Sequence, residues 1–164
     1  MTDRRTVFSL CRRYRYTLWR EWEPLLNRRY VQFIGLNPST ADEVQDDPTI
    51  RRCIDFAKRW GAGALCMTNA FAWRDTDPEM MKLQRRPIGA LNDRYILRVA
   101  AEAEFVVAAW GKHGTHRDRD RKLLALLSQI QKPIYCLRVN DDGTPQHPLY
   151  IAASTQPIIY PGRS

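Results

Sequence analysis

The stretch Tyr30-Val31-Gln32-Phe33-Ile34-Gly35-Leu36-Asn37-Pro38-Ser39-Thr40 decides the fold class of this 164-residue chain. Its first seven residues are mostly apolar, β-branched or aromatic, which is typical of a buried strand. Asn37-Pro38 ends the strand, because proline has no amide hydrogen to give to a neighbouring strand. The sequence therefore predicts a buried strand with a loop at its carboxyl end.

A helix and a second strand are predicted after this loop. Asp46-Asp47-Pro48 is typical of a helix start, with an acidic N-cap and proline in the first turn. Apolar residues then recur at helical spacing from Ile50 to Trp60, and Gly61 follows as a helix end. The apolar run over 64–68 indicates a second buried strand. A strand, a helix and a strand in this order predict parallel pairing with a right-handed crossover.

The remaining segments continue this alternation. We expect a polar loop over 74–87, helices over 89–103 and 116–130, and strands over 105–110 and 134–138. Large and charged side chains alternate over 14–19, which predicts an extra N-terminal strand at a sheet edge. No linker or repeat divides the sequence. Residues 1–164 are therefore expected to form one α/β domain around a mainly parallel sheet of four strands.

Composition restricts the partners and the location. The formal net charge of +8 favours a polyanionic partner, because Lys and Arg release counterions when they contact phosphates. No apolar run is long enough to span a membrane, and residues 1–5 lack the apolar stretch of a secretory signal, so a cytoplasmic protein is expected. The four cysteines form no C-x-x-C pair, which predicts neither a metal site nor disulfides. We expect no cofactor, and the oligomeric state stays open.

Polar and aromatic side chains follow all four predicted buried strands. Ligands of open parallel sheets bind outside the carboxyl ends of the strands. Amide, imidazole and aromatic groups together can stack on a flat polar ring such as a nucleobase and hydrogen-bond its edge. Each of the four segments that follow a strand can by itself be explained as a turn, a helix cap or part of the core. Because all four carry such side chains, one shared site is favoured. The exits are Asn37-Pro38-Ser39-Thr40, Asn69-Ala70-Phe71, Gly111-Lys112-His113-Gly114 and Gln146-His147-Pro148-Leu149.

Three acidic residues close to the first exit are further candidates. Asp42, Asp46 and Asp47 could reach the same crevice as a base or a cation ligand, although helix capping explains Asp46 and Asp47 better. The motifs G-x-S-x-G, G-x-x-x-x-G-K-[ST], G-x-G-x-x-G and H-E-x-x-H do not occur. Hydrolases of the nucleophile-elbow type, nucleotide triphosphatases, dinucleotide enzymes and zincins therefore lose their best support.

Several short motifs between about Tyr14 and Pro148 resemble a bacterial and phage family of uncharacterised domains with an NPSTAD signature. The resemblance names a family and no function. The residues that carry it are Asn37-Pro38-Ser39-Thr40-Ala41-Asp42, Asp47-Pro48-Thr49-Ile50-Arg51-Arg52, Trp60-Gly61, Thr68-Asn69 and Ala109-Trp110-Gly111.

Gly35-Leu36-Asn37-Pro38 and His147-Pro148 resemble, more distantly, the first and last motifs of the uracil-DNA glycosylase superfamily. Between them, Asn69 and Trp110-Gly111 follow strands in the same order as in that superfamily. The resemblance implies an α/β/α sandwich around a four-stranded parallel sheet. It also implies a site that binds a nucleobase after the base has been flipped out of DNA.

The same resemblance implies a role for each candidate residue. Asn37 would position or polarise a water, and His147 would stabilise negative charge on the departing base. Asn69 would select the base, and Phe71 or another aromatic ring would stack on it. The remaining substrate-binding candidates are Gly35, Leu36, Pro38, Ser39, Thr40, Asp42, Gly111, His113 and Pro148.

Three departures from the superfamily matter for function. No serine follows His147-Pro148, the cysteines lack an iron-sulfur arrangement, and Asn37 carries an amide, which cannot accept a proton from water. The simplest function is a glycosylase that acts on a modified or deaminated base in DNA. The alternatives are a non-catalytic module that binds nucleic acid or nucleobases, and an enzyme that acts on free modified nucleosides or nucleotides.

Overall fold

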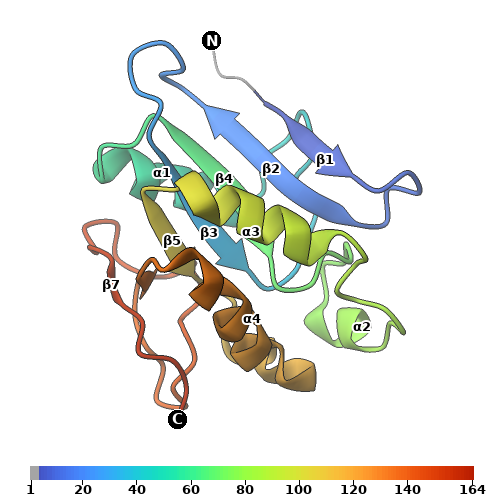
Figure 1. Ribbon diagram of the computed structural model, residues 1–164. Helices are drawn as coiled ribbons and strands as arrows, with labels where there is room; N and C mark the ends of the chain where they lie inside the picture. The colour runs from blue at the N-terminus through green and yellow to red at the C-terminus, as the bar shows by residue number, and fades with distance from the viewer. Residues whose placement is uncertain (1–3) are drawn as a thin grey trace.

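The computed structural model describes residues 4–164, which build a seven-stranded mixed sheet with helices on both faces (Figure 1). The strands are β1 Thr6–Phe8, β2 Arg15–Glu21, β3 Tyr30–Gly35, β4 Ala64–Asn69, β5 Phe105–Ala108, β6 Ile134–Cys136 and β7 Ile158–Ile159. The α-helices are α1 Pro48–Arg59, α2 Pro78–Lys82, α3 Asn92–Glu102 and α4 Arg119–Leu127, and the 3-10 segments are η1 Lys112–Asp118 and η2 Ser128–Ile130.

The sheet has the strand order β1-β2-β4-β3-β5-β6-β7. Strands β4, β3, β5 and β6 are parallel to one another, whereas β1, β2 and β7 pair antiparallel. The expected α/β class is therefore confirmed, and the expected number of four strands was too small. The expectation of a mainly parallel sheet was also wrong, because three of the six strand pairings are antiparallel. The N-terminal strand β2 also lies inside the sheet, between β1 and β4, and not at its edge.

Strand β3 is the central strand of the sheet, so the loop that follows it lies in the middle of the edge formed by the carboxyl ends of the parallel strands. It pairs with β4 on one side and β5 on the other, and all of its residues after Tyr30 are buried. A Cβ at Gly35 would lie 2.7 Å from Met67 Cε and 2.9 Å from Asn69 Nδ2, so any larger residue would displace the ends of these two side chains. Glycine at this position therefore leaves room for Asn69 at the end of β4.

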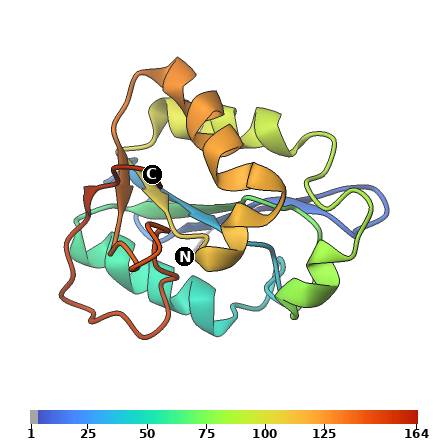
Figure 2. The same ribbon diagram turned by 90° about the horizontal axis from the view of Figure 1, so that it is seen from below.

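Two apolar clusters fill the space between the sheet and its helices. Helix α1 packs on one face, where Phe33, Phe56 and Trp60 are in ring contact. Helices α3 and α4 lie on the opposite face (Figure 2), where Ile96 and Leu123 join the second cluster. As the sequence predicts, α1 begins after the N-cap Asp47, whose side chain accepts the Ile50 amide hydrogen at 2.9 Å.

Local backbone geometry changes the predicted helices. The helix expected over 116–130 is divided into η1, α4 and η2, because Arg117 and Asp118 adopt left-handed φ angles of 55° and 56° that an α-helix cannot contain. The loop expected over 74–87 includes the short helix α2, which the side chain of Asp77 caps. In the part of the chain described, no helix is long and apolar enough to cross a membrane.

Candidate functional site

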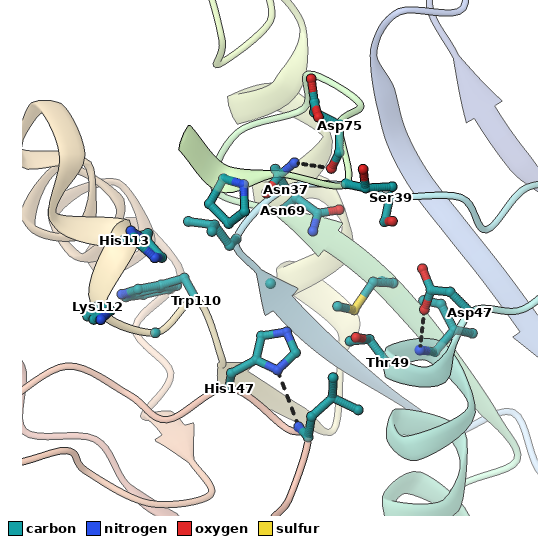
Figure 3. A pocket seen from close by; sticks show the side chains of 18 of the residues that line it. Asn37, Ser39, Asp47, Thr49, Asn69, Asp75, Trp110, Lys112, His113 and His147 are labelled. Atoms are coloured by element: carbon teal, nitrogen blue, oxygen red, sulfur yellow. Dashed lines mark hydrogen bonds between the residues drawn. The ribbon is translucent and has the colours of Figure 1, made fainter. Parts of the chain in front are cut away.

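A cavity of about 470 Å³ lies at the carboxyl ends of the parallel strands (Figure 3). All four predicted strand exits contribute to it, together with β2, the amino end of α1 and the segment after β4. Its lining residues are Arg15, Gly35, Leu36, Asn37, Ser39, Asp47, Thr49, Ile50, Met67, Asn69, Asp75, Thr76, Pro78, Trp110, Gly111, Lys112, His113, Asn140, Gln146, His147 and Leu149.

The side chain of Asn37 is held in one orientation. Its Nδ2 donates to the main-chain carbonyl of Asp75 at 2.8 Å, with longer contacts to the carbonyls of Pro38 and Trp73. Because carbonyls only accept hydrogen bonds, the nitrogen of the amide must face them. Within residues 4–164, Oδ1 has no hydrogen-bond partner. Asn37 therefore offers the cavity a fixed acceptor.

Asn69 is oriented by a buried arginine. Arg15, from β2, is 2% exposed and donates from Nη1 to the Ala41 carbonyl at 2.8 Å and from Nη2 to Asn69 Oδ1 at 3.5 Å. A guanidinium only donates, so this long contact favours the orientation in which the amide oxygen of Asn69 faces Arg15 and Nδ2 is left as a donor. Burial lowers the pKa of Arg15 to about 10, an effect that nearby Asp47 partly offsets. No carboxylate lies within ion-pair distance of Arg15 in the described chain.

The loop after β6 presents His147 in a defined tautomer. The Leu149 amide donates to His147 Nδ1 at 3.3 Å, so Nδ1 carries a lone pair and the proton of the neutral ring sits on Nε2. Burial lowers the pKa of His147 below its usual 6.5, which keeps the ring neutral at physiological pH. Figure 3 shows His147 on the side of the cavity opposite Asn37 and Asn69. His147 therefore adds an N–H donor facing an amide acceptor and an amide donor.

Charged and polar side chains border the rest of the cavity. Asp47 and Thr49 contribute from the amino end of α1, and Lys112 and His113 from η1. His113 Nδ1 lies 3.8 Å from Glu79 Oε1, while burial and the charge of Lys82 lower its pKa. Residues 4–164 contain no group of three or more His, Cys, Asp or Glu side chains that could hold a metal ion. The side chains that line the cavity can instead hydrogen-bond a polar organic ligand.

Eight of the predicted site residues line the cavity and five do not. Asp42 accepts the amide hydrogens of Val44 and Gln45 at 2.8 Å each, which lowers its pKa and uses its carboxylate to shape its own loop. The residues that line the cavity are Gly35, Leu36, Asn37, Ser39, Asn69, Gly111, His113 and His147, and those outside it are Pro38, Thr40, Asp42, Phe71 and Pro148.

Phe71 is the largest difference from the sequence-based expectation. Its ring is fully buried in the apolar cluster below α3 and α4, with the ring of His116 at 5.7 Å, and cannot stack on a ligand in the cavity. The backbone explains this position. Main-chain pairing continues past β4, with the Phe71 amide donating to the Leu36 carbonyl at 2.9 Å, and this strand-like geometry turns the side chain inward.

Arg15 is the main site residue that the sequence pattern missed. It stands on the strand predicted over 14–19, which was expected at a sheet edge. Its strand lies inside the sheet instead, and the antiparallel direction of β2 brings its first residue to the carboxyl ends of β3 and β4. Asp47 was predicted as a helix cap, and it both caps α1 and lines the cavity.

A family model described as "Protein of unknown function (DUF1643)" matches residues 15–149. The chain belongs to this family. In this DUF1643 chain every cavity-lining residue, from Arg15 to Leu149, falls inside the matched span. No curated protein and no solved structure matches the chain.

Proposed function

We propose that this DUF1643 chain recognises a nucleobase in the cavity between Asn37 and His147 and hydrolyses the N-glycosidic bond of a modified or deaminated base in DNA. The observation that carries the proposal is the neutral His147 ring, whose Nε2–H faces a site with a fixed amide acceptor on its opposite side. A neutral donor is suited to stabilising an anion that develops only in the transition state.

Each side chain has a part in the proposed reaction. A water hydrogen-bonded to Asn37 Oδ1 adds to the sugar carbon, and the glycosidic C–N bond breaks with its electron pair going to the base. His147 Nε2–H hydrogen-bonds the resulting anionic base, the added water loses its proton to solvent, and the base leaves after taking up a proton. Asn69 Nδ2, held by Arg15, donates to an acceptor on the base edge.

The layering of the fold supports the same proposal. Helix α1 on one face and α3 with α4 on the other are consistent with the α/β/α layering that the resemblance to the uracil-DNA glycosylase superfamily implies (Figure 2). The four parallel strands in the middle also match. In such sheets the ligand lies at the carboxyl ends of the strands, where this cavity is found.

One observation favours a second function, a non-catalytic module that binds a nucleobase. Asn37 uses its amide hydrogens on the carbonyl of Asp75 and has no group that can accept a proton from water. The site could still bind a nucleobase without a proton acceptor at Asn37, because Asn69 and His147 need only donate hydrogen bonds to the base. A third function, on free modified nucleosides, would use the same contacts.

One set of measurements, of binding and of product, distinguishes the three functions. The protein is incubated with oligonucleotides that carry uracil, hydroxymethyluracil or hypoxanthine, and with the corresponding free nucleosides, and abasic sites and released bases are measured. We expect abasic sites with wild-type protein, and their loss in Asn37→Ala and His147→Ala but not in Gln129→Ala, an exposed amide outside the cavity. Binding of such oligonucleotides without product from any base would overturn the glycosylase in favour of the binding module. Product from nucleosides alone would favour the third function.

A further inference from the structure

A second cavity, of about 610 Å³, is bordered by two of the structural elements that also border the first. Successive residues of a strand point to opposite faces of the sheet. At the start of β2, Arg15 therefore lines the first cavity, while Tyr14 and Tyr16 line the second. The segment after β4 also borders both cavities, with Asp75 at the first and residues 85–90 at the second. The two cavities therefore lie on opposite faces of the sheet, both next to the first residues of β2.

Ordered aromatic rings form one side of this second cavity. The rings of Tyr14 and Tyr16 stack with centroids 6.4 Å apart and planes 7° apart, and Tyr16 stacks in turn on Tyr95 of α3 at 5.2 Å. The Tyr14 hydroxyl donates to the Arg86 carbonyl at 2.8 Å, which holds its ring against the segment that carries the arginines. Pro87 and Ile88 extend this apolar surface.

The charged groups that line the second cavity are all guanidiniums. Arg85, Arg86 and Arg117 contribute them, and no carboxylate lines the cavity among the residues described. Arg85 and Arg86 are exposed and make no ion pair within residues 4–164. Arg117 donates to the carbonyls of Arg85 and Gln84 at 3.1 and 3.0 Å, which fixes the segment that carries Arg85. Elsewhere in the molecule exposed arginines such as Arg12 do pair with a carboxylate.

We propose that this second cavity binds a single-stranded segment of nucleic acid, with phosphates on Arg85 and Arg86 and an adjacent base against the partly exposed ring of Tyr14. The inference rests on the proposed function, because the segment would belong to the strand whose modified base occupies the first cavity. Guanidiniums bind phosphate oxygens through paired N–H donors, and aromatic rings accept any base face. An acidic peptide would satisfy the charge but would leave the stacked rings without a flat partner.

Cys11 gives a reporter for occupancy of this cavity. Its thiol lines the cavity and is exposed, while Cys53, Cys66 and Cys136 are buried. The reaction of Cys11 with a thiol reagent is followed with and without a saturating thymidine oligonucleotide that contains no modified base. We expect at least about tenfold slower reaction with the oligonucleotide, and a Cys11→Ser variant identifies the reacting thiol. Unchanged Cys11 reactivity, or equal protection by polyglutamate, would overturn the inference.

A charge-matched pair of variants tests the arginines. Arg85→Ala/Arg86→Ala should weaken oligonucleotide binding, measured by fluorescence anisotropy, by about tenfold, and should reduce the salt dependence of log K by about 1.4, near 0.7 per lost phosphate contact. Arg28→Ala/Lys58→Ala also removes two positive charges, but from surfaces outside both cavities, and should retain wild-type binding. Equal weakening in the two double variants would overturn the inference. Neither readout requires base release, so failure of the glycosylase leaves both measurements interpretable.

Discussion

Asn37 Nδ2 donates to the main-chain carbonyl of Asp75 over 2.8 Å and joins the loop after β3 to the segment after β4. This bond determines which end of the Asn37 amide meets the cavity. It also makes the site sensitive to a change of a single atom, because an oxygen in place of the nitrogen would face three carbonyl oxygens.

Asn37→Asp tests this relationship. At neutral pH we expect the free energy of unfolding to fall by about 1–3 kcal/mol, since a partly buried carbonyl loses its donor and meets a negatively charged oxygen. The same carbonyls favour the protonated carboxyl, so the folded-state pKa of the new acid lies above its unfolded value of about 3.9. Stability should therefore be recovered as pH falls toward 4, measured by urea unfolding. Asn37→Ala, which cannot titrate, should show no such recovery, and a pH-independent Asn37→Asp would contradict the assignment.

The neutral state of His147 makes stability depend on pH. Burial lowers its folded-state pKa below 6.5, so the unfolded chain binds a proton first as pH falls. Stability should thus decrease below about pH 6.5 and level off below the folded-state pKa. His147→Asn should show a weaker decrease between pH 7 and pH 5 in thermal unfolding. The lowered pKa values of the more exposed His113 and His116 act in both proteins and cancel in the comparison.

The tautomer of His147 can be observed directly. Nitrogen-15 NMR at pH 7 should place the ring proton on Nε2, because Nδ1 accepts from the Leu149 amide. A proton on Nδ1 would remove the donor on which the proposed base contact depends.

Substitutions of Phe71 test whether its side chain belongs to the core or stacks on a ligand. Phe71→Ala should lower the free energy of unfolding by about 3–5 kcal/mol, because it empties a fully buried site, whereas Phe71→Leu should lose less than about half of that. Oligonucleotide binding by the folded Phe71→Leu protein should equal that of the wild type. Lost binding with unchanged stability would return Phe71 to the ligand site.

Arg15 and Arg20 are two buried arginines of one strand with different partners. Arg20 Nε donates to Asp46 Oδ1 at 2.7 Å, and its other nitrogens donate to the carbonyls of Trp19 and Asp42. Arg20→Met leaves Asp46 with Arg4 as its ion-pair partner but removes the donors to both carbonyls, and should cost about 3 kcal/mol. Arg15 has no acidic partner within ion-pair distance in the described chain, and the loss from Arg15→Met should be under about 2 kcal/mol, because its desolvation penalty disappears with the charge.

The ligand affinities of the two variants should follow the opposite order. Arg15→Met frees the Asn69 amide to turn over and should weaken base binding by about tenfold, the equivalent of one hydrogen bond. Arg20→Met, measured under conditions where it is folded, should bind as the wild type does. Urea unfolding and titration with a labelled oligonucleotide provide the two measurements, and equal affinity of Arg15→Met and wild type would contradict the orienting role.

The central fold could be predicted from sequence because β3, α1 and β4 carry strong local signals. Glycine, proline and the Asp47 cap mark the ends of these elements, and the parallel topology then places Asn37 and Asn69 at one edge. Strands β1 and β7 were not predicted, because with three and two residues, respectively, they are too short to show the alternation of apolar and polar residues that is typical of a strand. Their pairing depends on neighbours that lie far away in the sequence.

The same distinction explains what was missed at the site. Residues that follow parallel strands could be placed by topology, and the cavity includes Gly111 and His147 as well as the two amides. To place Arg15 in the site, one must know the direction of β2 and the strand with which it pairs, and no local sequence pattern contains this information. Phe71 required knowledge that pairing with the β3 loop continues beyond β4.

The reversed direction of β2 has a consequence for the order in which the cavity forms. Arg15 leaves the ribosome early and His147 late, yet both border the same space. Contacts between residues so distant in sequence close large loops and form slowly. A nascent chain would present β3, α1 and β4 before the loop with His147 has emerged. Ligand capture would therefore begin only after the loop with His147 has emerged, when the central strands β3 and β4 can already be paired.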